Sequence, residues 1–207
     1  MSLMLRLAVV CLVGCGLAGG ALGADVTQLF GPGDFLSPKV RTADFESAAF
    51  NLWPITFDAT TRRFLAEDAS GGVTTSGRWG LSAERIHLLP LRVVLAGDVR
   101  EVGMYFGNDD YDAQFNAVLT AFDASGVSLG AVSVACNRND WVDQFIGLRA
   151  ASPIGRIELE YSRPAALGIT VFVDDFMAGM TVPEPGVGVL VGALGVMWLV
   201  GIVSRKR

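Results

Sequence analysis

The chain is poor in cysteine and histidine. Of its three cysteines, Cys11 and Cys15 lie in an apolar N-terminal stretch, which leaves only Cys136 in the remainder. An internal disulfide framework is therefore excluded. The single histidine, His87, rules out multi-histidine zinc sites and gives a histidine-dependent catalytic triad only one candidate. Its neighbours are apolar, so the sequence favours a packed histidine over a general base.

Basic residues are also scarce between the two ends of the chain. Apart from Arg6 and the last three basic residues, 12 basic side chains stand against 20 acidic ones before Val182, a formal charge of -8, and Lys39 is the only lysine. Such a surface disfavours nucleic acid and anionic membranes, and its carboxylates are available to hard cations. There is no P-loop, no dinucleotide-binding fingerprint and no amphipathic helix of three turns in this region.

The N-terminal end has the pattern of an export signal. Arg6 supplies a positive charge, Leu7–Leu17 an apolar stretch, and Ala21–Gly23 a small-residue cleavage site. The sequence therefore predicts a signal peptide over residues 1–23. A lipoprotein signal, in which Cys15 is lipidated and becomes the mature N-terminus, is the alternative, although it leaves a very short apolar stretch.

The C-terminal end, residues 182–207, combines three elements. Two prolines separate the preceding domain from an uncharged apolar segment, because proline cannot sit inside a regular helix. As a helix, Val187–Val203 would rise about 26 Å, close to the ~30 Å hydrocarbon core of a bilayer. The basic residues behind it favour a cytoplasmic end. In order, the elements are Pro183, Glu184 and Pro185, the apolar segment, and the basic stop Arg205, Lys206 and Arg207.

In this order the tail resembles the PEP-CTERM sorting signal of exported bacterial proteins. The resemblance implies that an exosortase, a membrane protease-transpeptidase, recognises Pro183, Glu184 and Pro185 and processes the protein near them. It also implies a protein that is membrane-anchored before processing and is then delivered to the cell surface or the extracellular matrix, where exopolysaccharide is a possible partner. The alternative is a plain single-span anchor.

Between the two ends, residues 24–181 make one domain with the periodicity of β-strands. Apolar residues alternate with acids in Ile157–Tyr161, and Val102, Met104 and Phe106 share one strand face. This pattern predicts an all-β antiparallel sandwich. A jelly roll is the first choice and an immunoglobulin-like sandwich the second, since the Cys-Trp-Cys framework of the latter is absent.

Turns and breaks in the alternation locate further strands. The sequence predicts a strand over Phe115–Phe122, a turn at Asp123–Gly126 and a following strand over Val127–Val134. Gly130 interrupts the alternation of that strand, which indicates a β-bulge. The last strand is predicted over Thr170–Met177. Trp53 and Trp79 lie among apolar neighbours and are assigned to the core.

A second resemblance covers the last third of the domain. Phe145–Leu148, Pro153–Leu159 and Val171–Phe176 look like the closing strands of galactose-binding-like, carbohydrate-binding jelly rolls. The resemblance implies that the first and last strands lie side by side. It also implies a structural calcium where an early acidic residue meets a late aspartate. The candidate ligands are Asp44, Glu46, Asp174 and Asp175.

The calcium hypothesis has a physical basis in the sequence. Alternation points Asp174 and Asp175 to opposite faces of their strand, so one of them is directed inward and needs a partner. Calcium takes about six to eight oxygen ligands, and loop carbonyls can supplement the carboxylates. The alternative is that these acids are solvated or hydrogen-bonded at a sheet edge.

Two polar loops with an aromatic residue are candidate ligand sites. Asn108, Asp109 and Tyr111 follow a predicted strand and could bind calcium or sugar hydroxyls, with Tyr111 stacking on a sugar ring. The EF-hand pattern does not fit this loop, because its glycine and terminal glutamate are out of register. Asn137–Trp141 is a similar loop. An ordinary polar turn is the alternative for each.

Two functions fit this sequence. The favoured one is a non-catalytic β-sandwich at the cell surface or in the matrix, which binds polysaccharide or has a structural role. The alternative is a small exported carbohydrate-active enzyme that uses two carboxylates. Acidic residues abound, but the sequence singles out no pair of them.

Overall fold

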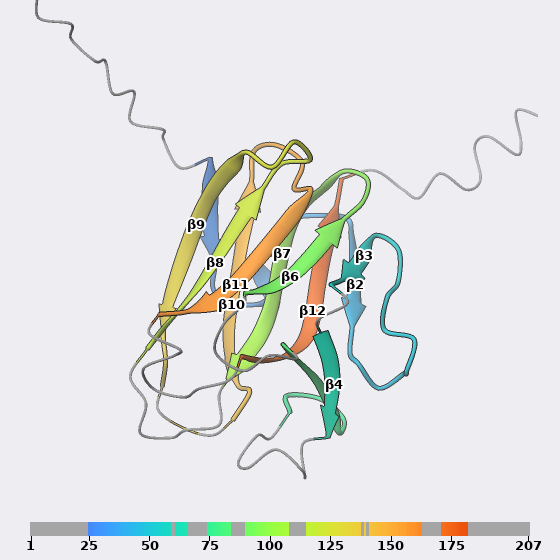
Figure 1. Ribbon diagram of the computed structural model, residues 1–207. Helices are drawn as coiled ribbons and strands as arrows, with labels where there is room; N and C mark the ends of the chain where they lie inside the picture. The colour runs from blue at the N-terminus through green and yellow to red at the C-terminus, as the bar shows by residue number, and fades with distance from the viewer. Residues whose placement is uncertain are drawn as a thin grey trace, which may run out of the picture.

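The computed structural model describes residues 25–58, 61–65, 74–83, 90–107, 115–137, 139, 141–162 and 171–181. In these ranges the chain forms two antiparallel sheets packed as a sandwich (Figure 1), so the predicted all-β class is confirmed. No helix in the same ranges is long and apolar enough to cross a membrane. The predicted signal peptide (1–23) and the sorting tail (182–207) lie outside the described residues.

The first sheet has seven strands in the order β1-β10-β7-β12-β5-β4, with β2 also beside β12, and the second has five in the order β3-β6-β11-β8-β9. From β9 to β12 successive strands alternate between the sheets, which favours the jelly roll. The strand bounds are Val26–Leu29 (β1), Lys39–Ala43 (β2), Ile55–Phe57 (β3), Thr61–Leu65 (β4), Trp79–Ala83 (β5), Leu91–Leu95 (β6), Val99–Gly107 (β7), Asn116–Phe122 (β8), Ser128–Ala135 (β9), Gln144–Ala150 (β10), Arg156–Tyr161 (β11) and Phe172–Met180 (β12).

The core lies between the inner faces of the two sheets. Val102, Met104 and Phe106 of β7 are fully buried there, as their spacing predicts. From the second sheet, Ile157 and Leu159 of β11 are buried in the same cluster. Because side chains alternate along a strand, the residues between the inward-facing ones lie on the outer face of each sheet.

The predicted hairpin and bulge are confirmed. Residues Asp123–Gly126 form the turn between β8 and β9, and the Asp123 carboxylate accepts hydrogen bonds from the main-chain amides of Ser125 and Val127. Ala121 pairs with Gly130 but Phe122 pairs with Ser128, so one extra residue is accommodated in β9. That register shift is the β-bulge that the break in alternation indicates.

Three details of the sequence prediction are wrong. The last strand continues to Met180, because β2 and β7 pair with it beyond Met177. The first strand, β1, pairs with β10, and it is β2 that lies beside β12. Trp53 is 45% exposed, since it lies in a turn rather than on a strand face, whereas Trp79 packs partly buried against the core.

A crossover segment, defined here as Phe30–Pro38, explains the displacement of β1. It connects β1, beside β10, with β2, beside β12, and therefore has to pass β7. It does so on the outer face of the first sheet, where Glu101 of β7 accepts hydrogen bonds from the amides of Leu36 (2.9 Å) and Ser37 (2.8 Å). It includes a short 3-10 helix, Pro32–Asp34.

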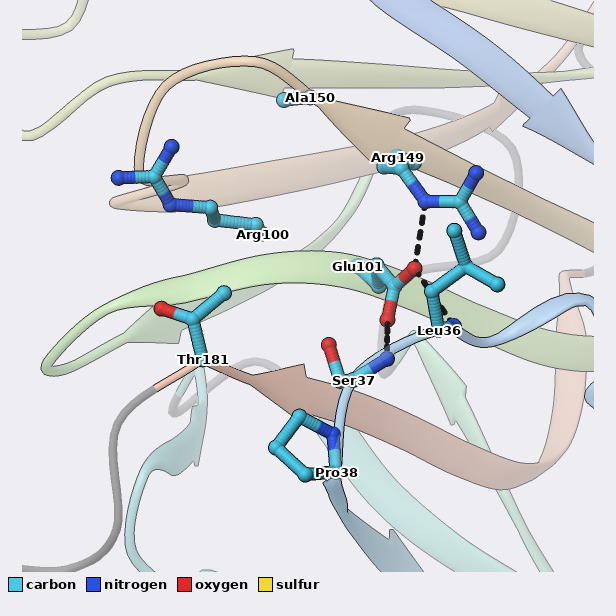
Figure 2. A pocket seen from close by; sticks show the side chains of 8 residues that line it. All are labelled: Leu36, Ser37, Pro38, Arg100, Glu101, Arg149, Ala150 and Thr181. Atoms are coloured by element: carbon cyan, nitrogen blue, oxygen red, sulfur yellow. Dashed lines mark hydrogen bonds and ion pairs between the residues drawn. The ribbon is translucent and has the colours of Figure 1, made fainter.

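Glu101 is the centre of this arrangement (Figure 2). Its side chain is buried, with the residue only 2% exposed, and the Arg149 Nε atom of β10 lies 2.5 Å from its carboxylate. Burial alone would raise the pKa of Glu101, but the hydrogen bonds from Ser37, Leu36 and Arg149 together lower it. The carboxylate is therefore charged and ties the crossover to two strands.

We expect Glu101→Gln to destabilise the fold by about 2–4 kcal/mol. Leu36 and Arg149 donate to the same carboxylate oxygen of Glu101, and an amide nitrogen in its place cannot accept either hydrogen bond. Urea denaturation measures the loss. The matched control is Glu158→Gln on β11, whose pairs with Arg92 and Arg156 are more exposed and should contribute less than about 1 kcal/mol. Equal losses in the two variants would contradict the role given to Glu101.

Candidate functional site

An exposed tryptophan stands in the loop between β9 and β10. Trp141 is 55% exposed, and its main-chain amide donates to the Asn139 side chain at 3.1 Å. The amide groups of Asn137 and Asn139 each donate to one oxygen of the Asp143 carboxylate at 2.9 Å. We call these four residues the Trp141 loop. Its polar groups are held by hydrogen bonds to one another and to the main chain of Trp141.

Contacts with the neighbouring strands hold the Trp141 loop on the sandwich. Val142 is fully buried directly after the tryptophan. A Cβ atom on Gly107, at the end of β7, would lie 2.3 Å from the Trp141 carbonyl oxygen, so only glycine permits this close approach. Gln144 accepts from the amide of Asn137 and donates to the Ala135 carbonyl. The loop is thus fixed to β7, β9 and β10.

The outer face of the first sheet carries an aromatic pair of its own. Tyr105 of β7 pairs in register with Phe145 of β10, and their half-buried rings meet edge to face with centroids 5.5 Å apart. An exposed indole offers a flat apolar surface, while amide and carboxylate groups offer directed hydrogen bonds. This combination suits a ligand that has both apolar faces and hydroxyl groups.

The sequence also predicts a second candidate loop. Asn108, Asp109 and Tyr111 lie outside the described residues. For the Trp141 loop, the sequence does indicate a polar segment with an aromatic residue. It does not indicate the pairing of Asn137 and Asn139 with Asp143, because the spacing alone does not say which polar groups meet.

The late aspartates lie where β12 changes its neighbour. Phe172 and Val173 pair with β5, whereas Phe176–Met180 pair with β2. On the β7 side the register shifts between Asp174 and Met177, and Asp175 has a left-handed backbone (φ 47°). This bulge leaves two residues of β12 opposite one of β7.

The bulge overturns the expectation that Asp174 and Asp175 point to opposite faces. Both carboxylates meet Ser76, whose amide donates to Asp174 and whose hydroxyl donates to Asp175, each at 2.8 Å. Asp174 shares the outer face with its register partner Tyr105, yet it is fully buried beneath the turn Thr74–Gly77. Its other oxygen accepts from the amide of Asp175 at 2.8 Å. The predicted need for a partner is met by these donors.

The early acids lie close to the late ones. Asp44 directly follows Ala43, which pairs with Phe176 of β12. Burial raises the pKa of Asp175, and the negative charges of Asp44 and Glu46 raise it further. Glu46 itself accepts hydrogen bonds from the amides of Trp79 and Arg78, which lower its pKa. Asp44, Glu46, Asp174 and Asp175 therefore lie in one region of the fold.

These acids do not form a ligand set for calcium by themselves. Burial raises the pKa of Asp174 to about 7, and the nearby charge of Asp175 adds to the effect. The Asp174 and Glu46 carboxylates are already hydrogen-bonded to amides. Within the described ranges, no group of three or more acidic, histidine or cysteine side chains is arranged to hold a metal ion. The calcium hypothesis stays a prediction.

No known protein family matches the chain, and no curated protein is significantly similar to it. Several solved structures are similar, among them the following three. TmCBM61 in complex with β-1,4-galactotriose is 19% identical, with 67% of this chain and 94% of that one covered and a TM-score of 0.40. The CBM22-1 xylan-binding domain of Paenibacillus barcinonensis Xyn10C is 12% identical, with 70% and 97% covered and a TM-score of 0.43.

A DUF4465 family protein from Bacteroides caccae is 11% identical, with 75% of this chain and 86% of that one covered and a TM-score of 0.40. These likenesses are too distant to carry an argument about this chain. Its fold rests on its own strand order and register, and its candidate site on the contacts of the Trp141 loop.

We expect the stability of the fold to depend on pH through Asp174. Its pKa is about 7 in the fold, whereas an ordinary aspartate has a pKa of 3.8. Between these values the folded protein holds a proton that the unfolded chain releases, so this contribution to stability is present at low pH and lost as pH rises to 7. Relative to Asp174→Asn, the wild-type free energy of unfolding should fall by about 2 kcal/mol between about pH 5 and pH 7.

Urea denaturation across this pH range measures the difference. Asp123→Asn is the control, because hydrogen bonds from Ser125 and Val127 lower the pKa of Asp123, and its contribution stays constant at these pH values. Parallel profiles for wild type and Asp174→Asn would contradict the prediction.

If calcium binds the carboxylates, it should raise the melting temperature at high pH in the wild type and not in Asp174→Asn. Equal melting temperatures in calcium and in EDTA would refute the calcium hypothesis.

Proposed function

We propose that this domain binds a polysaccharide through the Trp141 loop. The observation that carries the proposal is that a tryptophan is 55% exposed while its main chain is fixed by Asn139 and by the buried Val142. An aromatic side chain has only two side-chain torsions to order, so it loses little conformational entropy when it packs against a ligand. Amide and carboxylate groups beside it are suited to sugar hydroxyls.

The charge of the domain favours a neutral polysaccharide. Residues before Val182, without Arg6, carry a formal charge of -8, and a polyanionic glycan would be repelled by such a surface. The charged residue of the Trp141 loop, Asp143, is acidic as well. Uncharged hydroxyl groups can donate to the Asp143 carboxylate and accept from the side-chain amides of Asn137 and Asn139 without a charge penalty.

The role we propose is binding rather than catalysis. Hydrogen bonds hold the pKa values of Glu46, Asp98, Glu101 and Asp123 low, so these groups are poor general acids. Asp174 has a pKa near that of a general acid, but it is fully buried and cannot reach a substrate. A small carbohydrate-active enzyme with two carboxylates is the alternative.

We also propose that the domain is exported and sorted by exosortase to the cell surface or the extracellular matrix. The support is the order of the tail elements, Pro183, Glu184 and Pro185 before an apolar segment and a basic end. The end of the last strand lies close to the start of the tail. Strand β12 ends at Met180, and Thr181 bonds Asp98 with both its amide and its hydroxyl, so folded structure extends to the residue before Val182.

The binding proposal predicts that Trp141→Ala lowers the affinity for a polysaccharide that the wild-type protein binds at least about tenfold, or roughly 1.4 kcal/mol. The stability of the fold should be unchanged. Pull-down and glycan-array measurements with neutral and acidic polysaccharides test it. Trp53→Ala is the matched control, since Trp53 is also about half exposed, at 45%, but lies in the turn before β3. Binding that survives Trp141→Ala, or that is lost equally in both variants, would contradict the proposal.

A hydrolysis assay on the same polysaccharides separates the alternative. Turnover that disappears on replacement of a single aspartate or glutamate would favour the enzyme. Binding without turnover supports a non-catalytic domain.

The sorting proposal predicts that alanine at Pro183, Glu184 and Pro185 keeps the domain on a membrane-bound precursor, because exosortase would no longer recognise the tail. Cell fractionation and the mass of the protein measure this. Val182→Ala is the control and should be processed as the wild type is. A triple variant with wild-type mass and distribution would refute the sorting assignment.

A further inference from the structure

The side chain of Thr75 connects the region of the buried aspartates with the Trp141 loop. Thr75 lies in the turn Thr74–Gly77, and its hydroxyl donates a hydrogen bond to the carbonyl oxygen of Val142. Val142 directly follows Trp141 and is fully buried. The two residues are far apart in sequence, so this contact exists only because the fold brings the turn to the loop.

The turn that carries Thr75 is itself well anchored. Ser76 bonds Asp174 through its amide and Asp175 through its hydroxyl, each at 2.8 Å. The Thr74 hydroxyl donates to the Gly77 carbonyl at 3.1 Å. Gly77 has a φ of 55°, and a Cβ atom there would lie 2.3 Å from the Glu46 carboxylate, which needs this space. Thr75 therefore projects from a turn that is fixed to β12.

The exposed indole depends on its main chain for its position. Trp141 is more than half exposed, so packing around its ring restrains it little. On the N-terminal side its amide is held by Asn139, and on the C-terminal side the carbonyl of Val142 is held by Thr75. These two bonds enclose the residue that the proposed function uses.

We propose that Thr75 is a positioning residue for Trp141: its hydroxyl ties the Trp141 loop to the turn that Asp174 and Asp175 hold on β12. The consequence for polysaccharide binding rests on the proposed function, but the positioning itself does not. Without the hydroxyl, the Val142 carbonyl loses the hydrogen bond that Thr75 donates, and the loop can shift relative to β12.

The test uses the full-length chain labelled with 5-fluorotryptophan and observed by fluorine NMR. The chain has four tryptophans, and the Trp141 resonance is identified by its loss in Trp141→Phe. Thr75→Val, which keeps the shape of the side chain and removes the hydroxyl, should shift or broaden the Trp141 resonance while that of Trp53 stays in place. Thr75→Ser restores the hydroxyl and should return the resonance to its wild-type position.

Thr61→Val is the matched control, because the Thr61 hydroxyl also donates to a carbonyl, that of Asp58 at 2.7 Å, but away from the Trp141 loop. It should leave the Trp141 resonance unchanged. An unchanged resonance in Thr75→Val, equal shifts of all four resonances, or no restoration by serine would overturn the proposal.

If Thr75→Val does not fold, Ser76→Ala replaces it as the test. This variant removes only the hydrogen bond between the turn and Asp175. It should shift the Trp141 resonance, and the absence of a shift would overturn the proposal. No polysaccharide is involved, so a failure here is distinct from a failure of the binding proposal.

Discussion

Hydrogen bonds from main-chain amides to carboxylates hold the loops of this domain onto its sheets. Glu101 accepts from Leu36 and Ser37 and thereby fixes the crossover segment. Glu46 and Asp174 hold the two sides of the turn that precedes β5. A domain with one cysteine and one lysine before Val182 has few other means of fastening loops. Its surplus of acidic residues supplies acceptors, and the free amides of irregular segments supply the donors.

The balance between burial and hydrogen bonding decides the charge of each acid. For Glu101, donors from the crossover and from Arg149 outweigh burial, so the pKa is lowered and the group stays charged. For Asp174, burial and the neighbouring Asp175 outweigh the donors, and the pKa rises to about 7. The first carboxylate therefore stabilises the fold throughout the neutral range, whereas the second weakens it as pH increases.

The sequence predicts those parts of the fold that depend on local periodicity. The alternation in Ile157–Tyr161 and the break at Gly130 are confirmed because the side-chain period of a strand is a local property. The crossover could not be predicted, because its position depends on Glu101, more than sixty residues away. Trp53 was misplaced for a related reason, since apolar neighbours in sequence do not say whether a turn covers them.

The candidate site shows the same limit. The sequence identifies Trp141 and its polar neighbours, but not the contact between Thr75 and Val142, which joins the turn before β5 to the loop before β10. It also identifies Asp174 and Asp175, but not the bulge that turns both towards Ser76. Residue types are readable from the sequence, whereas their geometry depends on long-range pairing.

The two ends of β7 give the proposed functions a spatial relation. At its C-terminal end Gly107 lies against the Trp141 main chain, and at its N-terminal end Val99 pairs with Met180, next to Thr181 and Asp98. Nine residues of strand extend roughly 26–30 Å. The described chain thus ends on the side of the sandwich opposite the exposed tryptophan. A domain attached through that end would present Trp141, the residue that the proposed function uses, away from its attachment.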